Sequence, residues 1–176
     1  MPVKVVCAVI RKGFRVFCVQ KGGTKYPYTS YKWEFPGGKV EEGELRQQAL
    51  RRELKEELDY DVKVDSRVAT VTHAYPDFEI ELDAWQCRPA KDAVYTLSEH
   101  VDARWVPVWK LGKMDFADAD RRIIRRMNRS RRIWVLLDIL CYVPLYYLLF
   151  QFSWWTLLIA LVTLALFLVF DLLYLY

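Results

Sequence analysis

Residues 38–60 read GKVEEGELRQQALRRELKEELDY, and this stretch decides how the first part of the chain folds. From Glu44 to Leu58 it contains strong helix formers and neither glycine nor proline, which predicts a helix over these residues. At about 3.6 residues per turn, Leu50, Leu54 and Leu58 fall on one stripe. An apolar stripe of this kind faces a hydrophobic core, so the helix is expected to pack on a sheet or on another helix.

Three acidic residues occupy the neighbouring stripe of the same helix. Glu53, Glu56 and Glu57 span about 100° of its circumference. Like charges at this spacing destabilise a helix by a few tenths of a kcal/mol per pair, and the interspersed arginines and lysine offset part of that repulsion. A divalent cation would offset more, and carboxylates suit Mg²⁺ or Mn²⁺ bound together with substrate phosphates. Taken alone, the helix would still fit an ordinary solvated acidic face.

The loop ahead of the helix favours a metal site over a solvated face. It reads Phe35-Pro36-Gly37-Gly38-Lys39, with two adjacent glycines. Glycine lets the backbone approach a ligand closely or adopt positive φ. A carbonyl of Gly37 or Gly38 could therefore join a metal shell, and Lys39 could contact a phosphate.

Apolar runs on both sides of this stretch predict a sheet. The predicted strands are Val3–Ile10, Phe14–Gln20, Trp33–Phe35, Tyr60–Ala74, Phe78–Arg88 and Arg104–Trp109, and a second helix is predicted over Asp118–Asn128. The first two strands read as a hairpin around Lys12-Gly13. The pattern indicates an α+β fold in which two helices pack on a sheet.

The quoted stretch resembles the Nudix box, which runs Gly, five residues, Glu, seven residues, Arg-Glu, apolar, any, Glu-Glu, any, Gly, apolar. The matching positions are Gly38, Glu44, Arg52, Glu53, Leu54, Glu56, Glu57 and Tyr60. Asp59 replaces the late glycine at the end of the helix, where left-handed φ is common, and Asp tolerates that conformation better than most residues. The resemblance covers roughly residues 3–128 and is strongest to MutT-like nucleoside triphosphate pyrophosphohydrolases. It implies an α/β/α sandwich with a mixed sheet.

The resemblance also implies a role for each matching residue. Glu53, Glu56 and Glu57 would hold Mg²⁺ or Mn²⁺, with a Gly37 or Gly38 carbonyl assisting. Arg52 would orient a glutamate, and Glu44 would pair within the box.

Family members often add a catalytic, metal-binding glutamate from a later loop. Glu99, within Leu97-Ser98-Glu99-His100, matches that place, and a solvated loop residue is the alternative. Glu53 or Glu99 would take the proton of the attacking water. The products would be a nucleoside monophosphate and pyrophosphate.

Substrate choice depends on the start of the last helix, where MutT-like enzymes read the base. Asp120 stands there, whereas 8-oxoguanine enzymes hold Asn. An ionised Asp only accepts hydrogen bonds, so it favours a base that offers an amino group, such as cytosine. Capping the helix is the alternative role for Asp120. Lys21, Phe35 and Phe78 are further candidates for contacts to base or phosphate.

The end of the chain has a different composition. Every Lys and Arg lies at or before Arg132, and residues 133–150 and 154–176 carry one charge each, an aspartate in both cases. A spanning helix needs about 20 apolar residues. We therefore expect a Nudix domain over 1–130 and a transmembrane two-helix hairpin over 131–176, with residues 133–176 in the lipid bilayer.

The arginine-rich residues 121–132 place the domain on the cytoplasmic side of that membrane by the positive-inside rule. A nucleic-acid polymer is not the expected partner of this run, because apolar segments follow it immediately. A soluble dimerisation hairpin is the alternative for the tail.

The cysteines and the intact acids limit the other functions. The four cysteines are widely spaced and the chain has two histidines, which argues against a zinc site and for reduced, buried thiols. A non-catalytic nucleotide-sensing domain is one rival function, although no acid of the box is lost. A hydrolase of another nucleotide-linked or membrane-associated diphosphate is the second rival.

Overall fold

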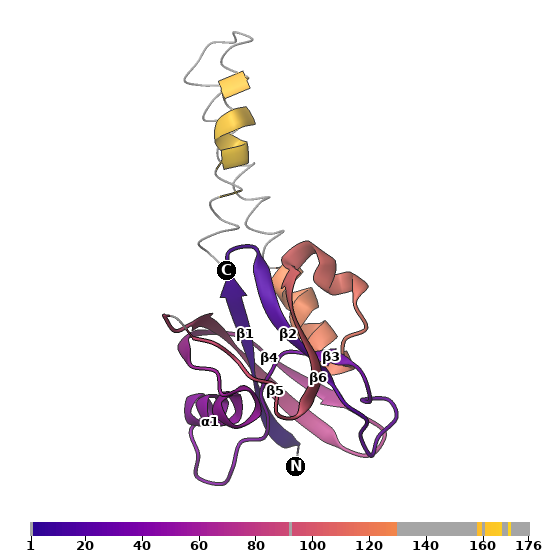
Figure 1. Cartoon of the computed structure of the whole chain (residues 1–176). Helices are drawn as coiled ribbons and strands as arrows, with labels where there is room; N and C mark the ends of the chain where they lie inside the picture. Colours follow the sequence, from indigo (N-terminus) through magenta and orange to yellow (C-terminus); the bar gives the residue numbers. More distant parts are fainter. Residues whose placement is uncertain (1, 92, 130–157, 160, 167–168, 170–176) are drawn as a thin grey trace. The chain divides into compact units, whose positions relative to one another are not determined.

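The computed structural model describes residues 2–91, 93–129, 158–159, 161–166 and 169. The chain divides into two compact units, Met1–Arg126 and Met127–Tyr176. The elements are β1 (Val3–Lys12), β2 (Arg15–Lys21), β3 (Trp33–Glu34), α1 (Arg46–Leu58), β4 (Val62–Ala74), β5 (Glu79–Pro89), β6 (His100–Pro107) and the 3₁₀ helix η1 (Val108–Lys113) (Figure 1). A further helix covers residues 118–129.

Strand β1 joins the two halves of a mixed sheet. The strand order is β3-β2-β1-β5-β4, with β6 also paired to β2. β1 runs parallel to β5 from Val3 to Ile10 and meets β2 as an antiparallel partner only at Arg11 and Lys12. This arrangement confirms the predicted α+β fold with a mixed sheet.

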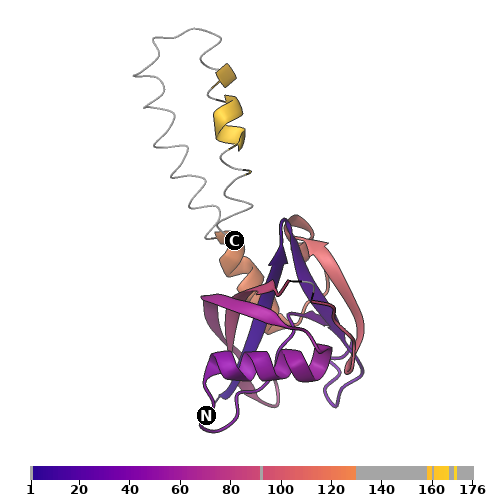
Figure 2. The same cartoon turned by 60° about the vertical axis from the view of Figure 1, so that its left-hand side comes forward.

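β1 is buried on both faces, as strands of parallel pairs usually are. Val6, Ala8 and Ile10 belong to the core cluster that contains the leucines of α1, and the alternate residues Cys7 and Val9 are equally buried. Figures 1 and 2 show α1 on one side of the sheet and the helix over 118–129 on the other. Each face of β1 therefore has a helix covering it.

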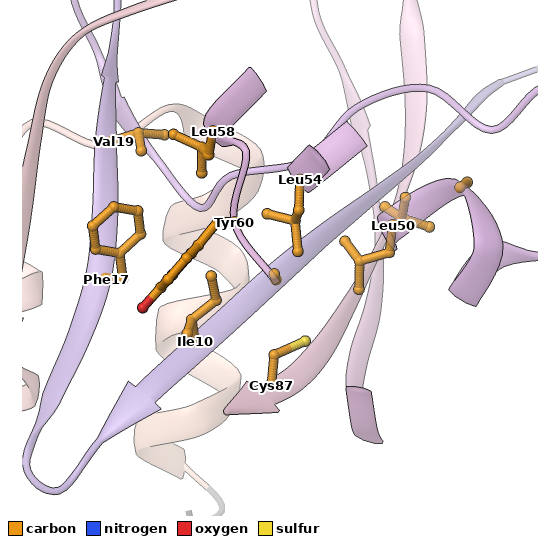
Figure 3. Packing of buried hydrophobic residues seen from close by; sticks show 11 residues of the cluster. Ile10, Phe17, Val19, Leu50, Leu54, Leu58, Tyr60 and Cys87 are labelled. Atoms are coloured by element: carbon orange, nitrogen blue, oxygen red, sulfur yellow. The ribbon is translucent and has the colours of Figure 1, made fainter. Parts of the chain in front are cut away.

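The leucine stripe of α1 packs as predicted. Leu50, Leu54 and Leu58 are fully buried and lie against β1, β2, β5 and the chain just after α1 (Figure 3). The partners labelled there are Ile10, Phe17, Val19, Tyr60 and Cys87. Burying one leucine side chain contributes about 1.5–3 kcal/mol, so the stripe fixes the rotation of α1 about its axis.

The carboxyl end of α1 confirms the expectation for Asp59. Its φ of 46° and ψ of 37° are left-handed, and its N–H donates to the Lys55 carbonyl at 3.0 Å. The next N–H, from Tyr60, donates to the Leu54 carbonyl at 3.2 Å. Replacing the family's glycine by Asp thus leaves the helix end properly closed.

The sixth strand differs from its prediction. β6 begins at His100 rather than Arg104, and it ends at Pro107, where η1 takes over. The strand predicted through Trp109 is therefore wrong at its end. Proline has no N–H to continue a ladder, and the following Val-Trp pair resembles a strand only in composition.

The predicted transmembrane hairpin lies largely on residues outside the described ranges. In the second unit, residues 158–159, 161–166 and 169 are helical. Across the described residues, no helix has both the length and the apolar character needed to cross a membrane.

In the first unit, Cys7, Cys18 and Cys87 are buried free thiols, as predicted for them.

Candidate active site

The glycine loop lies against β1. The Ala8 N–H donates to the Pro36 carbonyl at 2.8 Å, and the Val6 N–H donates to the Gly38 carbonyl at 2.9 Å. Residues 36–40 therefore run beside the central strand, which gives the loop a fixed position next to α1.

Both glycines of this loop are required by their surroundings. Gly37 has a φ of 146°, and a Cβ added to it would overlap the Val6 carbonyl. A Cβ at Gly38 would overlap the carboxylate of Glu53. Glu53 thus lies directly against bare backbone. The Gly38 carbonyl is already engaged by Val6, whereas no hydrogen bond to the Gly37 carbonyl occurs within the described residues.

Arg52 is the centre of the acidic face. Its guanidinium donates to both carboxylate oxygens of Glu44, each at 3.1 Å, and to one oxygen each of Glu53 and Glu56 at 3.0 Å. It also donates to the Lys39 carbonyl at 3.0 Å. Arg52 holds the pKa of the Glu44 carboxyl below its usual range. The arginine thus ties the glycine loop to the helix and holds two of the three predicted metal ligands.

Glu57 is the third predicted ligand, and its environment is different. Its Oε2 is buried and has no hydrogen-bond partner within the described residues. Burial raises the pKa of Glu57 to about 7, His100 lowers it, and the nearby acids Glu34, Glu53 and Glu99 raise it further. Such a carboxylate is costly to keep charged unless a cation or a donor reaches it.

The loop before β6 brings Glu99 to this place. The Thr96 N–H donates to the Leu58 carbonyl at 2.7 Å, and the Ser98 N–H donates to the Glu57 carbonyl at 3.1 Å. These carbonyls at the end of α1 are satisfied by this loop, and Glu99 is therefore held close to Glu57. The structure thus places Glu99 near Glu57, and its catalytic, metal-binding role stays a prediction.

Sequence reasoning missed two residues that lie in the same site. The His100 Nε2 lies 3.3 Å from one carboxylate oxygen of Glu34, and the Lys21 Nζ lies 3.3 Å from the other. Strand alternation could have found Glu34, because Trp33 and Phe35 are buried on the opposite face. Lys21, a predicted phosphate or base contact, is thus paired with an acid in this structure.

The donors fit a hard divalent cation in chemistry, although the side chains are not gathered around one point. Within the described ranges, no three His, Cys, Asp or Glu side chains converge closely enough to form a metal site. The ion pairs explain why these side chains do not converge: Arg52 binds the carboxylates of Glu53 and Glu56. The buried Oε2 of Glu57 and the Gly37 carbonyl are oxygen ligands of the kind that Mg²⁺ and Mn²⁺ use.

Asp120 is buried, and its burial disfavours the ionised carboxylate that its predicted preference for an amino-bearing base requires. Its Oδ1 accepts the Phe35 N–H at 3.0 Å, and the Phe35 ring is itself buried against Phe116. Burial, with a smaller contribution from Glu34, raises the pKa of Asp120 to about 8. Burial therefore favours the protonated carboxyl, which can donate as well as accept. Asp120 in this form does not single out an amino-bearing base, because that preference requires an ionised carboxylate.

Phe78 belongs to an aromatic cluster next to Asp120. Its ring centroid lies 5.1 Å from those of Tyr26 and Tyr75. The Tyr75 hydroxyl accepts the Ala119 N–H at 3.4 Å, which places this cluster at the start of the helix that carries Asp120. The predicted base contacts Phe78 and Asp120 are therefore near one another, whereas the ring of Phe35 is not accessible.

The chain resembles known proteins in both sequence and fold. Residues 1–127 match the NUDIX domain family. An "8-oxo-dGTP diphosphatase" of Proteus vulgaris is 52% identical over 50 residues, which are 28% of this chain and 45% of that protein, so the match spans less than half of that relative. A "CTP pyrophosphohydrolase" of Escherichia coli (strain K12) is 32% identical over 121 residues, 67% of this chain and 85% of that protein. Among solved structures, the E. coli ORF135 protein matches with a TM-score of 0.63 and 29% identity, covering 73% of this chain and 90% of that one.

Proposed function

The chain belongs to the NUDIX domain family, and from that premise we propose that it is a Mg²⁺- or Mn²⁺-dependent pyrophosphohydrolase of nucleoside triphosphates. The observation that carries this proposal is the carboxylate of Glu57, whose Oε2 is buried with no hydrogen-bond partner among the described residues, near the glycine loop. An acid kept in that position without a function would only destabilise the fold. The relatives named as 8-oxo-dGTP diphosphatase and CTP pyrophosphohydrolase support hydrolysis of a diphosphate linkage.

The metal would be held by Glu53, Glu56 and Glu57, with the Gly37 carbonyl and Glu99 as additional oxygen donors. When bound, a divalent ion supplies neutralisation of phosphate charge and activation of a water molecule. Glu53 and Glu56 would then share their carboxylates between Arg52 and the ion.

The reacting groups follow from the same arrangement. Glu53 or Glu99 accepts the proton of the attacking water, whose oxygen bonds to a phosphorus atom of the substrate. The bridging phosphorus–oxygen bond breaks, and pyrophosphate separates from the nucleoside monophosphate. Arg52 keeps Glu53 in place through its hydrogen bond, and its pair with Glu44 anchors the guanidinium. Lys39 is exposed at the edge of the loop and is available to a phosphate.

The proposed substrates are a pyrimidine triphosphate and an oxidised purine triphosphate, since the relatives bear both kinds of name. Asp120 and the Phe78 cluster would form the base site. A neutral Asp120 can present one donor and one acceptor, which suits a base edge that carries both.

We also propose that residues 131–176 tether the domain to a membrane, with residues 1–130 on the cytoplasmic side. The support is in the sequence: two long segments carry one charge each, and an arginine-rich run precedes them.

The proposal is tested by pyrophosphate release from the full chain in detergent with Mg²⁺, Mn²⁺ or EDTA. Glu56→Gln and Glu57→Gln should each lower the metal-dependent rate sharply, whereas Glu42→Gln, an exposed acid outside the site, should not. Unchanged turnover in both box variants would disprove the metal assignment. A panel of dCTP, 5-methyl-dCTP, 8-oxo-dGTP and dATP then identifies the base.

A further inference from the structure

An aromatic pair, half-buried Phe14 and exposed Trp109, lies at the end of the sheet where β1 turns into β2. Phe14 follows the turn glycine, Gly13, and its carbonyl accepts the Val108 N–H at 3.0 Å. This bond places η1 beside the turn, and the rings of Phe14 and Trp109 lie 6.2 Å apart. Trp109 nevertheless remains 61% exposed. An exposed indole beside a second aromatic ring offers apolar area that a contact surface can use.

The residues around this pair are basic. Lys12 and Arg15 flank Phe14 in the turn, and Lys110 and Lys113 follow Trp109 in η1; all four are exposed. Residues 11–15 and 108–114 contain no acid. None of the four cations forms an ion pair within the part of the chain that the structure describes. We name these residues the aromatic–basic surface: Lys12, Phe14, Arg15, Trp109, Lys110 and Lys113.

The last helix of the first unit runs toward the same end. Both views show residues 118–126 approaching the end of the sheet that carries the β1–β2 turn and η1 (Figures 1 and 2). Arg122, Arg125 and Arg126 are exposed on this helix, and the sequence beyond Arg132 becomes almost free of charge. The aromatic–basic surface therefore lies at the end of the unit toward which its last helix leads.

We propose that the aromatic–basic surface contacts an anionic lipid bilayer, an inference that rests on the proposed membrane location. Tryptophan is favoured at the lipid–water interface, and each Lys or Arg near an anionic surface strengthens binding. The charge and the position both favour this contact: the two segments that carry the aromatic pair also carry four exposed cations, and they lie at the end of the unit toward which its last helix leads. α1 lies toward the opposite end of β1 in both views, so lipid contact leaves the acidic face accessible to substrate.

The test uses the fragment 1–129, which lacks the apolar segments. The fragment contains the whole core cluster, and the family match ends at residue 127, so it comprises a complete folding unit. It should co-sediment with phosphatidylcholine vesicles that contain phosphatidylserine, and much less with pure phosphatidylcholine. Trp109→Ala should lower the partition coefficient about tenfold through lost apolar burial. Lys12→Gln and Lys110→Gln should each lower it about fivefold.

The control is Lys4→Gln, an exposed lysine at the other end of β1, which should leave binding unchanged. Absence of binding to anionic vesicles, or equal binding by Trp109→Ala and the parent fragment, would overturn the proposal. Loss of oligonucleotide binding in the Trp109 and lysine variants, with vesicle binding intact, would assign the surface to nucleic acid instead. Turnover measured on the same samples reports the proposed function separately, and alkaline extraction of membranes holding the full chain reports the tether.

Discussion

Asp120→Asn provides the most informative perturbation of the base site. Asn keeps the Oδ1 that accepts the Phe35 N–H and removes only the titration. The pKa of Asp120 is raised from 3.8 to about 8, first by burial and then by Glu34. Between these two values the unfolded chain is ionised at this residue while the folded protein keeps the proton.

The sign and size of the effect follow from proton linkage. Because the folded state binds more protons, the free energy of unfolding of the parent protein falls as pH rises through this window, by about 1.4 kcal/mol per pH unit. From about pH 5.5 to about pH 7.5 this group alone removes about 2.5 kcal/mol, the slope flattening near the folded pKa. The amide in the Asp120→Asn variant does not titrate and contributes no such loss, so the variant should gain that amount over the parent across the interval.

Urea denaturation of the fragment 1–129 in EDTA at several pH values measures this difference. Groups that do not interact with Asp120 titrate alike in both proteins and cancel in the comparison. Asp115→Asn is the matched control, because Lys32 and Arg121 hold the pKa of Asp115 below its ordinary value and its titration is complete below the interval. The difference in the free energy of unfolding between Asp115→Asn and the parent should be independent of pH. If the difference in the free energy of unfolding between Asp120→Asn and the parent is also independent of pH, Asp120 is ionised in the folded protein. Its burial then does not raise its pKa.

Three other predictions address the acidic face and the core. In EDTA, Glu57→Gln should raise the free energy of unfolding near pH 8, because it removes the charge of a buried carboxylate oxygen that has no partner among the described residues, while it abolishes metal-dependent pyrophosphate release. An unchanged or lower free energy of unfolding would contradict that burial. Gly38→Ala should lower turnover about a hundredfold with the circular dichroism spectrum retained, because its Cβ displaces the Glu53 carboxylate; normal turnover would contradict the fit of Glu53 against the loop. Leu54→Ala should cost about 2–5 kcal/mol in urea denaturation, because Leu54 is fully buried, and a loss below about 1 kcal/mol would contradict its place in the core.

Local sequence patterns predicted the elements that depend on neighbours along the chain. The stripe of Leu50, Leu54 and Leu58 and the left-handed Asp59 follow from helix geometry and glycine substitution alone. The turn between β1 and β2 follows from Gly13. The parallel pairing of β1 with β5 was not predictable in the same way, because its partners are more than seventy residues apart and nothing local specifies the register.

The site shows the same division between local and distant contacts. Spacing placed Glu53 and Glu56 on one face, with Arg52 beside them. The burial of Glu57 was not predictable, because it depends on the loop that donates from Ser98 to the end of α1. The burial of Asp120 likewise depends on a hydrogen bond that spans more than eighty residues. Ionisation states are therefore the part of the site that sequence patterns describe least well.

The five hydrogen bonds of Arg52 determine whether the domain needs a metal ion in order to fold. In an acidic helix with no internal cation, a bound metal ion would relieve the repulsion between the acids, and chelation would then destabilise the helix. Here the guanidinium serves as a permanent counter-ion, so the domain can complete its folding before it meets any metal. Under the proposed metal dependence, metal supply would control turnover without controlling the abundance of the protein, and metal starvation would leave a folded, inactive domain.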